Sequence, residues 1–350
     1  MSPPELCPTC GDSGLRLCHK GDDLVLRCQD RDCDRKHSVL KFCNVLSRVR
    51  YHNWSCKSLL QGIRAYCSTP LTMPSAAAVS KIVEVNESQV RDLFDNLRAA
   101  EARAGKEDAS TAEMTGNLEC DGTCVKKFYV HVNSGRFSDA TEKFQSKNPG
   151  NSPDRLLIYH RVAGILERGG NGRLILASLP LEPVRPDGGP PTESKNDIQV
   201  SKLLERVCGR KAFMHSDGNI AWQSECRSRK IAQASVVHSK MEFARKLTPE
   251  ENRKSKAAWK SRPMKTSKVQ KNVNGKAPRG VNICGTQSID STWRYLKRYM
   301  PGSLPALTAD KSRLNPKVWQ YMFSFQFRRN IVRCSADLLF DSLGKVVQAR

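Results

Sequence analysis

Apolar residues recur every three or four positions from about residue 59 to residue 104, as on one face of an amphipathic helix. Ser75 is a suitable N-cap for one such helix, and Glu87 or Ser88 for the next. The pattern therefore predicts a helix-turn-helix of about 28 residues within a helical region spanning 41–105.

Short strand-like runs replace the helical spacing from about Asn117 onward. The runs at 156–166 and 173–179 flank Gly169-Gly-Asn-Gly172, which is typical of a hairpin. A helical stretch at 197–207 then precedes two further short strands, at 212–215 and 234–238. Strands alternating with helices predict an α/β fold with a mixed sheet.

A basic, linker-like segment interrupts this pattern at about 245–282. Between residues 251 and 280 there are ten Lys or Arg and one acid, so we expect a flexible insert outside the sheet. Two helices, at 288–300 and 317–332, should then close the core.

The charge of the chain points to a polyanionic partner. Its 350 residues include 58 basic and 35 acidic side chains, a formal net charge of +23. No segment approaches the ~20 apolar residues of a membrane-spanning helix, and the N-terminus does not resemble a secretory signal. We expect an intracellular protein located at DNA, in the nucleus if the source is eukaryotic.

The first 40 residues are rich in cysteine and poor in long apolar runs, so we expect a metal to hold them together. Two close cysteine pairs, 17 residues apart, match the spacing of a zinc ribbon that binds one Zn²⁺. Cys18 and His19 lie between the pairs, and either could replace one ligand. The predicted zinc ligands are Cys7, Cys10, Cys28 and Cys33.

Three aspartates are candidates for a phosphoryl-transfer site: Asp121 and Asp217 at strand ends, and Asp290 in the first turn of a helix. Such acids can meet at one sheet edge and hold two Mg²⁺ or Mn²⁺ ions through oxygen ligands. Taken singly, each has an ordinary structural interpretation, as a turn residue before glycine or as a first-turn helix acid. Lys297 and Arg298 lie about two helical turns after Asp290 and are candidate DNA contacts.

The chain resembles DDE transposases with an N-terminal zinc ribbon, of small bacterial insertion sequences and the eukaryotic Merlin elements. The resemblance covers about residues 7–330 and includes the following segments: Cys28-x4-Cys33 with Arg35-Lys36-His-Ser, Leu118-Glu-Cys-Asp121, Val162–Arg168, His215-Ser-Asp217-Gly, Val236-Val-His238-Ser, Gln287-Ser-Ile-Asp290-Ser-Thr-Trp293 and Phe325–Asn330. The resemblance implies an RNase H-like core over about 110–335 and a role for His238 near the scissile phosphate. It also implies that the protein binds transposon ends and target DNA and works as a homodimer or larger synaptic assembly.

Two departures from the family pattern concern the third acid. Asp290 stands where the family usually has Glu or Asn, and the basic insert lengthens the interval before it. We expect a transposase that binds terminal inverted repeats, and the alternatives are a domesticated DNA-binding protein without cleavage activity and an RNA-directed nuclease. Trp293 is expected to pack in the core, and Glu119 to be an exposed structural acid or an auxiliary ligand.

Overall fold

The computed structural model describes residues 9–10, 15–20, 23–30, 32–33, 35–38, 54–69, 71–72, 74–133, 135, 137–150, 153–169, 172–237, 240–261 and 283–332. The chain divides into two compact units, one made of residues 1–104 with 327–350 and the other of residues 105–326. Among the described residues, no helix is long and apolar enough to cross a membrane.

The first unit begins with a small antiparallel sheet of strands β1 (Leu15–Lys20), β2 (Asp23–Cys28) and β3 (Lys36–Ser38), in the order β1-β2-β3. Leu15 pairs with Cys28 across the first hairpin, and Val25 pairs with Ser38 across the second ladder.

A helical cluster forms the rest of this unit: α1 (Cys56–Ser68), α2 (Ala76–Val83), α3 (Glu87–Thr111) and the end of α9 (Pro316–Val332). Ser75 caps α2 as predicted, by accepting the N–H of Ala78. At the start of α3 the capping acceptor is Asn86, which binds the N–H of Ser88, so the prediction of Glu87 or Ser88 as the cap is wrong. The helices share a buried core of Trp54, Leu59, Tyr66, Cys67, Val79, Val83, Val90, Leu93, Phe94, Leu97, Ala100 and Phe327.

The second unit is an α/β structure built on a mixed sheet, as the sequence predicts. The strand order is β6-β5-β4-β8-β9, with β7 paired to β5. β4 is antiparallel to β5 and parallel to β8, and β8 is parallel to β9. The strands are β4 (Met114–His131), β5 (Arg155–Glu167), β6 (Leu174–Ser178), β7 (Glu182–Val184), β8 (Val207–Ser216) and β9 (Ala232–Ser235).

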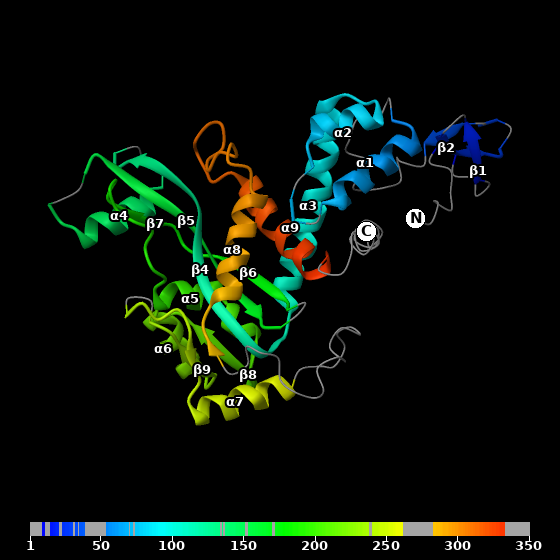
Figure 1. Ribbon diagram of the computed structural model, residues 1–350. Coiled ribbons are helices and arrows are strands. Elements are labelled where there is room, and N and C mark those ends of the chain that lie inside the picture. The colour runs from blue at the N-terminus through cyan, green and yellow to red at the C-terminus, as the bar shows by residue number, and fades with distance from the viewer. Residues whose placement is uncertain are drawn as a thin grey trace. The chain divides into compact units, whose positions relative to one another are not determined.

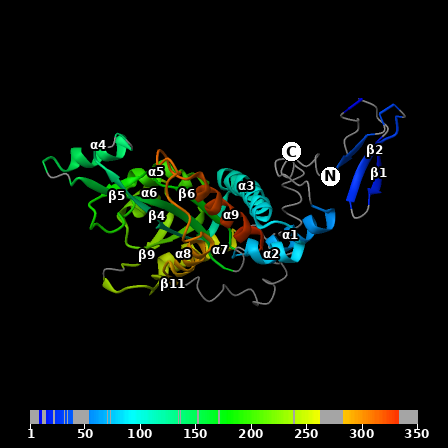
Figure 2. The ribbon, with the colours of Figure 1, turned by 90° about the horizontal axis from the view of Figure 1, so that it is seen from above.

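Helices cover both faces of this sheet (Figures 1 and 2). α5 (Lys195–Ser201), the short 3-10 helix Leu203–Arg206 and α6 (Ile220–Ser228) lie on one face, where Trp222 and Ile198 belong to the same buried core as Leu118 and Cys120. α7 (Pro249–Lys260) and α8 (Gln287–Tyr299) lie on the other face. The remaining elements of the unit are α4 (Ser138–Lys147), β10 (Arg245–Lys246) and β11 (Ile283–Cys284), with β10 and β11 forming a two-stranded sheet.

The helix α7 corrects the prediction of a flexible insert outside the sheet at 245–282. Thr248 and Glu251 form a capping box, and Pro249 occupies the first helical turn, where its missing N–H costs nothing. The Ser255 hydroxyl donates to Asn117 Oδ1 of β4 at 2.7 Å, so the helix is attached to the sheet. Residues 262–282 of the predicted insert lie outside the described residues.

Strand β4 is much longer than the sequence suggests, and Asp121 lies within it rather than at its end. The parallel pairing with β8 nevertheless stops at Cys120 and Ser216. Asp121 and Asp217 are therefore the residues that directly follow the last parallel pair. Beyond this point β4 continues as a ribbon paired with β5, with an irregularity in register between Cys124 and Lys126.

Candidate active site

Asp121 is held on β4 by a tryptophan of α8. The indole Nε1 of Trp293 donates to Asp121 Oδ2 at 2.8 Å. The residue opposite Asp121 on β5 is Gly164, and a Cβ at that position would lie 2.7 Å from the Trp293 ring. The glycine thus makes room for the indole beside the acid. Trp293 is 5% exposed, as expected for a core residue, but it also binds the first acid, which the sequence did not indicate.

Asp217 lies in the turn between β8 and α6. Its Oδ1 accepts the backbone N–H of Asn219 at 3.1 Å, and the Asn219 side chain in turn caps α6 by accepting the N–H of Ala221. Both side chains are half-buried. This local bonding is the turn role that the Asp217-Gly218 pair suggests, and it also fixes the carboxyl at the end of the strand.

Asp290 lies in the first turn of α8, and its Oδ2 accepts the hydroxyl of Thr286 at 3.1 Å. A carboxylate in this position is stabilised by the positive end of the helix dipole. Asp290 is half-buried and belongs to the same helix as Trp293, three residues away.

Asp121 is partly buried and is affected by the charges of the other acids. Burial raises the pKa of Asp121 well above its usual value, and the hydrogen bond from Trp293 opposes this rise. The charges of Glu193, Asp217 and Asp290 raise the pKa further, in that order of size. Asp121 and Asp217 directly follow the last parallel pair of β4 and β8, and Trp293, three residues after Asp290, binds Asp121. The three aspartates thus lie around the end of the parallel pairing, together with a fourth carboxyl.

The fourth carboxyl, Glu193, was not predicted from the sequence. A Cβ on Gly122 would lie 1.8 Å from Glu193 Oε1, so the glutamate occupies the space that a side chain next to Asp121 would need. Burial raises the pKa of Glu193, and the charge of Asp217 adds to the rise. Its Oε2 accepts the Asn219 amide at 2.7 Å. The available signal was the Ser194-x-x-Asp197 capping box, which places Glu193 just before a helix.

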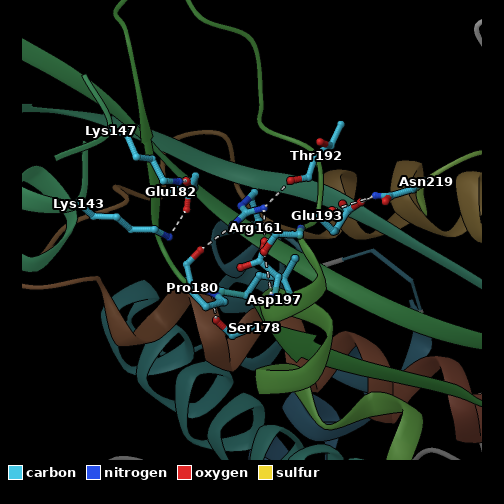
Figure 3. Close-up of polar contacts among 12 residues, drawn as sticks. Lys143, Lys147, Arg161, Ser178, Pro180, Glu182, Thr192, Glu193, Asp197 and Asn219 are labelled. Atoms are coloured by element: carbon cyan, nitrogen blue, oxygen red, sulfur yellow. Dashed lines mark hydrogen bonds and ion pairs between the residues drawn. The ribbon is translucent and has the colours of Figure 1, made fainter. Parts of the chain in front are cut away.

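Arg161 of β5 fixes the loop that carries Glu193, as Figure 3 shows. The guanidinium is 2% exposed and donates to the carbonyls of Thr192 and Pro180 and to Asp197 Oδ2 at 3.1–3.2 Å. A buried arginine with several acceptors holds a loop more firmly than one surface contact would. The position of Glu193 is thus determined by the sheet itself.

Of the predicted DNA contacts, the structure describes the side chains of Lys297, Arg298 and Arg35. Lys297 and Arg298 are exposed on α8. Burial raises the pKa of the Cys124 thiol, and the charge of Lys297 opposes this rise, so Lys297 lies on the side of α8 that faces Cys124 of β4. Arg35 is exposed, whereas the side chain of Lys36 and the whole of His238 lie outside the described residues.

Glu119 is neither an exposed structural acid nor, by its contacts, an auxiliary ligand. It is 1% exposed, and both of its carboxylate oxygens bind protein donors, Arg168 Nε and the N–H of Ile289, each at 2.8 Å. The prediction of exposure is wrong because α8 covers this face of β4.

Three of the four predicted zinc ligands come together beside the small sheet, Cys28 at the end of β2 and Cys10 and Cys33 in turns. The sulfur atoms of Cys10, Cys28 and Cys33 all lie within 4.8 Å of one another, and Cys18 is not part of this group among the described residues. The Cys10 and Cys28 sulfurs are 3.5 Å apart. Two thiolates about 2.3 Å from a tetrahedral zinc would be separated by about 3.8 Å, so the spacing suits that metal. Cys7 and the side chain of His19 lie outside the described residues.

Comparison of the chain with known protein families, with curated proteins and with solved structures found no match.

Proposed function

We propose that the chain is a DNA transposase with an RNase H-like core, which cuts and joins strands by metal-dependent phosphoryl transfer. One observation carries the proposal: carboxyls from β4, the β8 end and the start of α8 converge where the parallel pairing of β4 and β8 stops. The strand order and the helices on both faces suit the RNase H-like arrangement that the sequence resemblance implies.

The chemistry of the donors suits magnesium or manganese. Carboxylate oxygens are hard ligands, and several of them crowded in a partly buried site need a cation to be charged together. Asp121, Asp217 and Asp290 would hold the ions, and Glu193 lies beside them. When bound, two such ions activate an attacking water or 3′-hydroxyl and stabilise the leaving oxygen of a phosphodiester.

The surrounding side chains have distinct tasks in this proposal. Trp293 orients Asp121 through its indole N–H, and Asn219 holds both Glu193 and the Asp217 turn. Lys297 and Arg298 are exposed on the helix that carries Asp290 and would contact the DNA phosphates. The net charge of +23 favours the same substrate.

For the N-terminal sheet we propose one Zn²⁺, bound by Cys10, Cys28, Cys33 and Cys7. The ribbon, with Arg35 and Lys36 after the last cysteine, and the helix-turn-helix would recognise the inverted repeats.

Replacing Cys28 by Ser should reduce the zinc content of the purified chain from about one ion to near zero. Cys28 is 2% exposed and its sulfur belongs to the cluster with Cys10 and Cys33, so its loss leaves too few thiolates for a closed tetrahedral shell. Elemental analysis measures the outcome, with Cys18→Ser as the matched control. Full zinc content in the Cys28 variant would contradict the proposed ligand set.

The shorter third acid gives specific support to a second function, a DNA-binding protein that keeps this fold without cutting. Asp has one methylene less than Glu, so the carboxyl of Asp290 reaches less far from α8. Cleavage assays on inverted-repeat DNA with Mg²⁺ or Mn²⁺ separate the two functions, because the binder retains the DNA and yields no cut strand. Competition between RNA and DNA substrates tests an RNA-directed nuclease.

Asp217→Asn should abolish strand cleavage while repeat-DNA binding stays within about twofold of the wild type. Asparagine keeps the oxygen that accepts the Asn219 N–H, and with it the turn, but removes the negative charge that a metal ion needs. Denaturing gels of end-labelled repeat DNA give the cleavage rate, and a binding titration gives the affinity.

The matched control is Asp187→Asn, a change of the same chemistry at an exposed position of the loop after β7. It should cut at the wild-type rate. If Asp217→Asn also cuts normally, the acidic edge is not the place of phosphoryl transfer.

A further inference from the structure

A buried ion pair connects β4 and β5 to the start of α8. Glu119 Oε1 accepts Arg168 Nε at 2.8 Å, and the side chains of the two residues are 2% and 10% exposed. Arg168 also donates through its terminal nitrogens to the carbonyls of Ile283 and Gly285, in the segment that leads into α8. We call Glu119 and Arg168 the clasp.

The clasp also caps α8. Thr286 occupies the N-cap position but makes no capping hydrogen bond to the helix backbone. The N–H of Ile289 instead donates to Glu119 Oε2 at 2.8 Å. A carboxylate from a neighbouring strand thus satisfies an N–H of the first turn and interacts favourably with the positive end of the helix.

The bond between Glu119 and the N–H of Ile289 connects the neighbourhoods of two of the acids, Asp121 and Asp290. Glu119 and Asp121 are two residues apart on β4 and therefore share one face, which α8 covers. Ile289 directly precedes Asp290. The clasp consequently joins the strand of the first acid to the turn of the third, and Trp293 makes a second link one helical turn later.

We propose that Glu119 and Arg168 are positioning residues, which hold Asp290 at the distance from Asp121 at which both bind the same metal ions. The inference rests on the proposed function. It assigns the two residues no contact with metal or DNA. Because Asp290 is a short third acid, the reach of its carboxyl depends on where the clasp places the helix start.

Two variants of the full-length chain test the clasp. Glu119→Gln removes the charge, and Arg168→Lys keeps the charge but loses the planar fork that reaches several acceptors. Arg173→Lys is the matched control, since Arg173 pairs with Asp108 of α3 in the same unit. Hydrogen exchange of residues 287–292 is measured first, against residues 294–299 of the same helix. Binding of Mn²⁺ alone is then titrated without DNA.

In both clasp variants the amide hydrogens of residues 287–292 should exchange at least tenfold faster than in the wild type. The exchange rates of residues 294–299 and of β5 should be unchanged. Mn²⁺ affinity should fall at least tenfold, and the Mg²⁺ concentration for half-maximal cleavage should rise by a similar factor at an unchanged KM for DNA. Wild-type Mn²⁺ affinity in both variants would overturn the inference, and so would faster exchange spread over the whole α/β unit. A wild-type chain that binds Mn²⁺ but cuts no DNA would contradict the proposed function and not the role of the clasp. Hydrogen exchange and Mn²⁺ binding test the clasp without DNA cleavage.

Discussion

Asp121→Asn is expected to reduce strand cleavage about a thousandfold and, in the same protein without divalent cations, to raise the melting temperature at neutral pH. The two effects have one cause. The carboxyl is partly buried among the charges of Glu193, Asp217 and Asp290, an arrangement that suits a cation and destabilises the empty site. Asparagine removes the repulsion together with the metal ligand, while its side-chain oxygen can still accept the Trp293 N–H.

The pH dependence follows from the direction of the pKa shift. The pKa of Asp121 is higher in the folded chain than the ordinary value of 3.8. The stability that this group contributes is therefore fully present below about pH 3.8 and is lost as the pH rises through the folded pKa. Wild type and Asp121→Asn should thus differ little in melting temperature at acid pH and increasingly at neutral pH.

Thermal melts in EDTA between pH 4 and pH 8 measure this difference, with Asp187→Asn as the control that should follow the wild type. Adding Mg²⁺ should raise the melting temperature of the wild type and leave Asp121→Asn nearly unchanged. A variant that is less stable than the wild type across this pH range would show that Asp121 has a structural role only.

Arg328→Met is expected to lower the free energy of unfolding of the helical unit by about 3–5 kcal/mol. Arg328 and Glu101 are both fully buried, with Arg328 Nε 3.0 Å from each carboxylate oxygen. The guanidinium also donates to the carbonyls of Tyr66 and Thr69 and lies over the Tyr66 ring, 4.1 Å from its centroid. Its removal leaves the buried Glu101 carboxylate without this cation, while the hydrogen bond from the Tyr66 hydroxyl stays.

An exposed ion pair on α3 provides the control for this prediction. Arg91 pairs with Glu87 on α3, where the side chains are 70% and 39% exposed, so Arg91→Met should cost well under 1 kcal/mol. Urea titrations followed by hydrogen exchange of α1 and α3 measure both variants. Equal losses in the two would contradict the assignment of Arg328 as the central contact of this core.

Local patterns predicted much of the secondary structure. The Ser75 cap, the hairpin after β5 and the helices α8 and α9 lie within two residues of their expected bounds, because each depends on a short run of periodic apolar residues and a nearby terminator. Charge was a poorer guide. The basic composition after residue 245 concealed α7. The features that stabilise this helix are a capping box and two buried residues, Ser255 and Ala258, which a compositional average does not reveal.

The candidate site was predicted in part, since Asp121 and Asp217 directly follow the parallel pairing of β4 and β8 and Asp290 lies in the first turn of α8. For Glu193 and Glu119 the sequence could indicate a local position but not the tertiary contacts. Their surroundings depend on Gly122, Arg161, Arg168 and Ile289, which are brought together by tertiary packing and carry no common local pattern. The same two acids could have been exposed in another arrangement of these helices.

Successive side chains of β4 point to opposite faces of the sheet, and this alternation limits which insertions and deletions the strand can tolerate. Glu119 and Asp121 both point toward α8, whereas Cys120 between them packs on the opposite face with Trp222. Inserting or deleting one codon between positions 119 and 121 would turn one acid into the apolar layer. Among divergent copies, the Glu-x-Asp spacing should therefore survive where loop lengths vary, and its loss would mark a lineage in which this edge no longer has its original geometry.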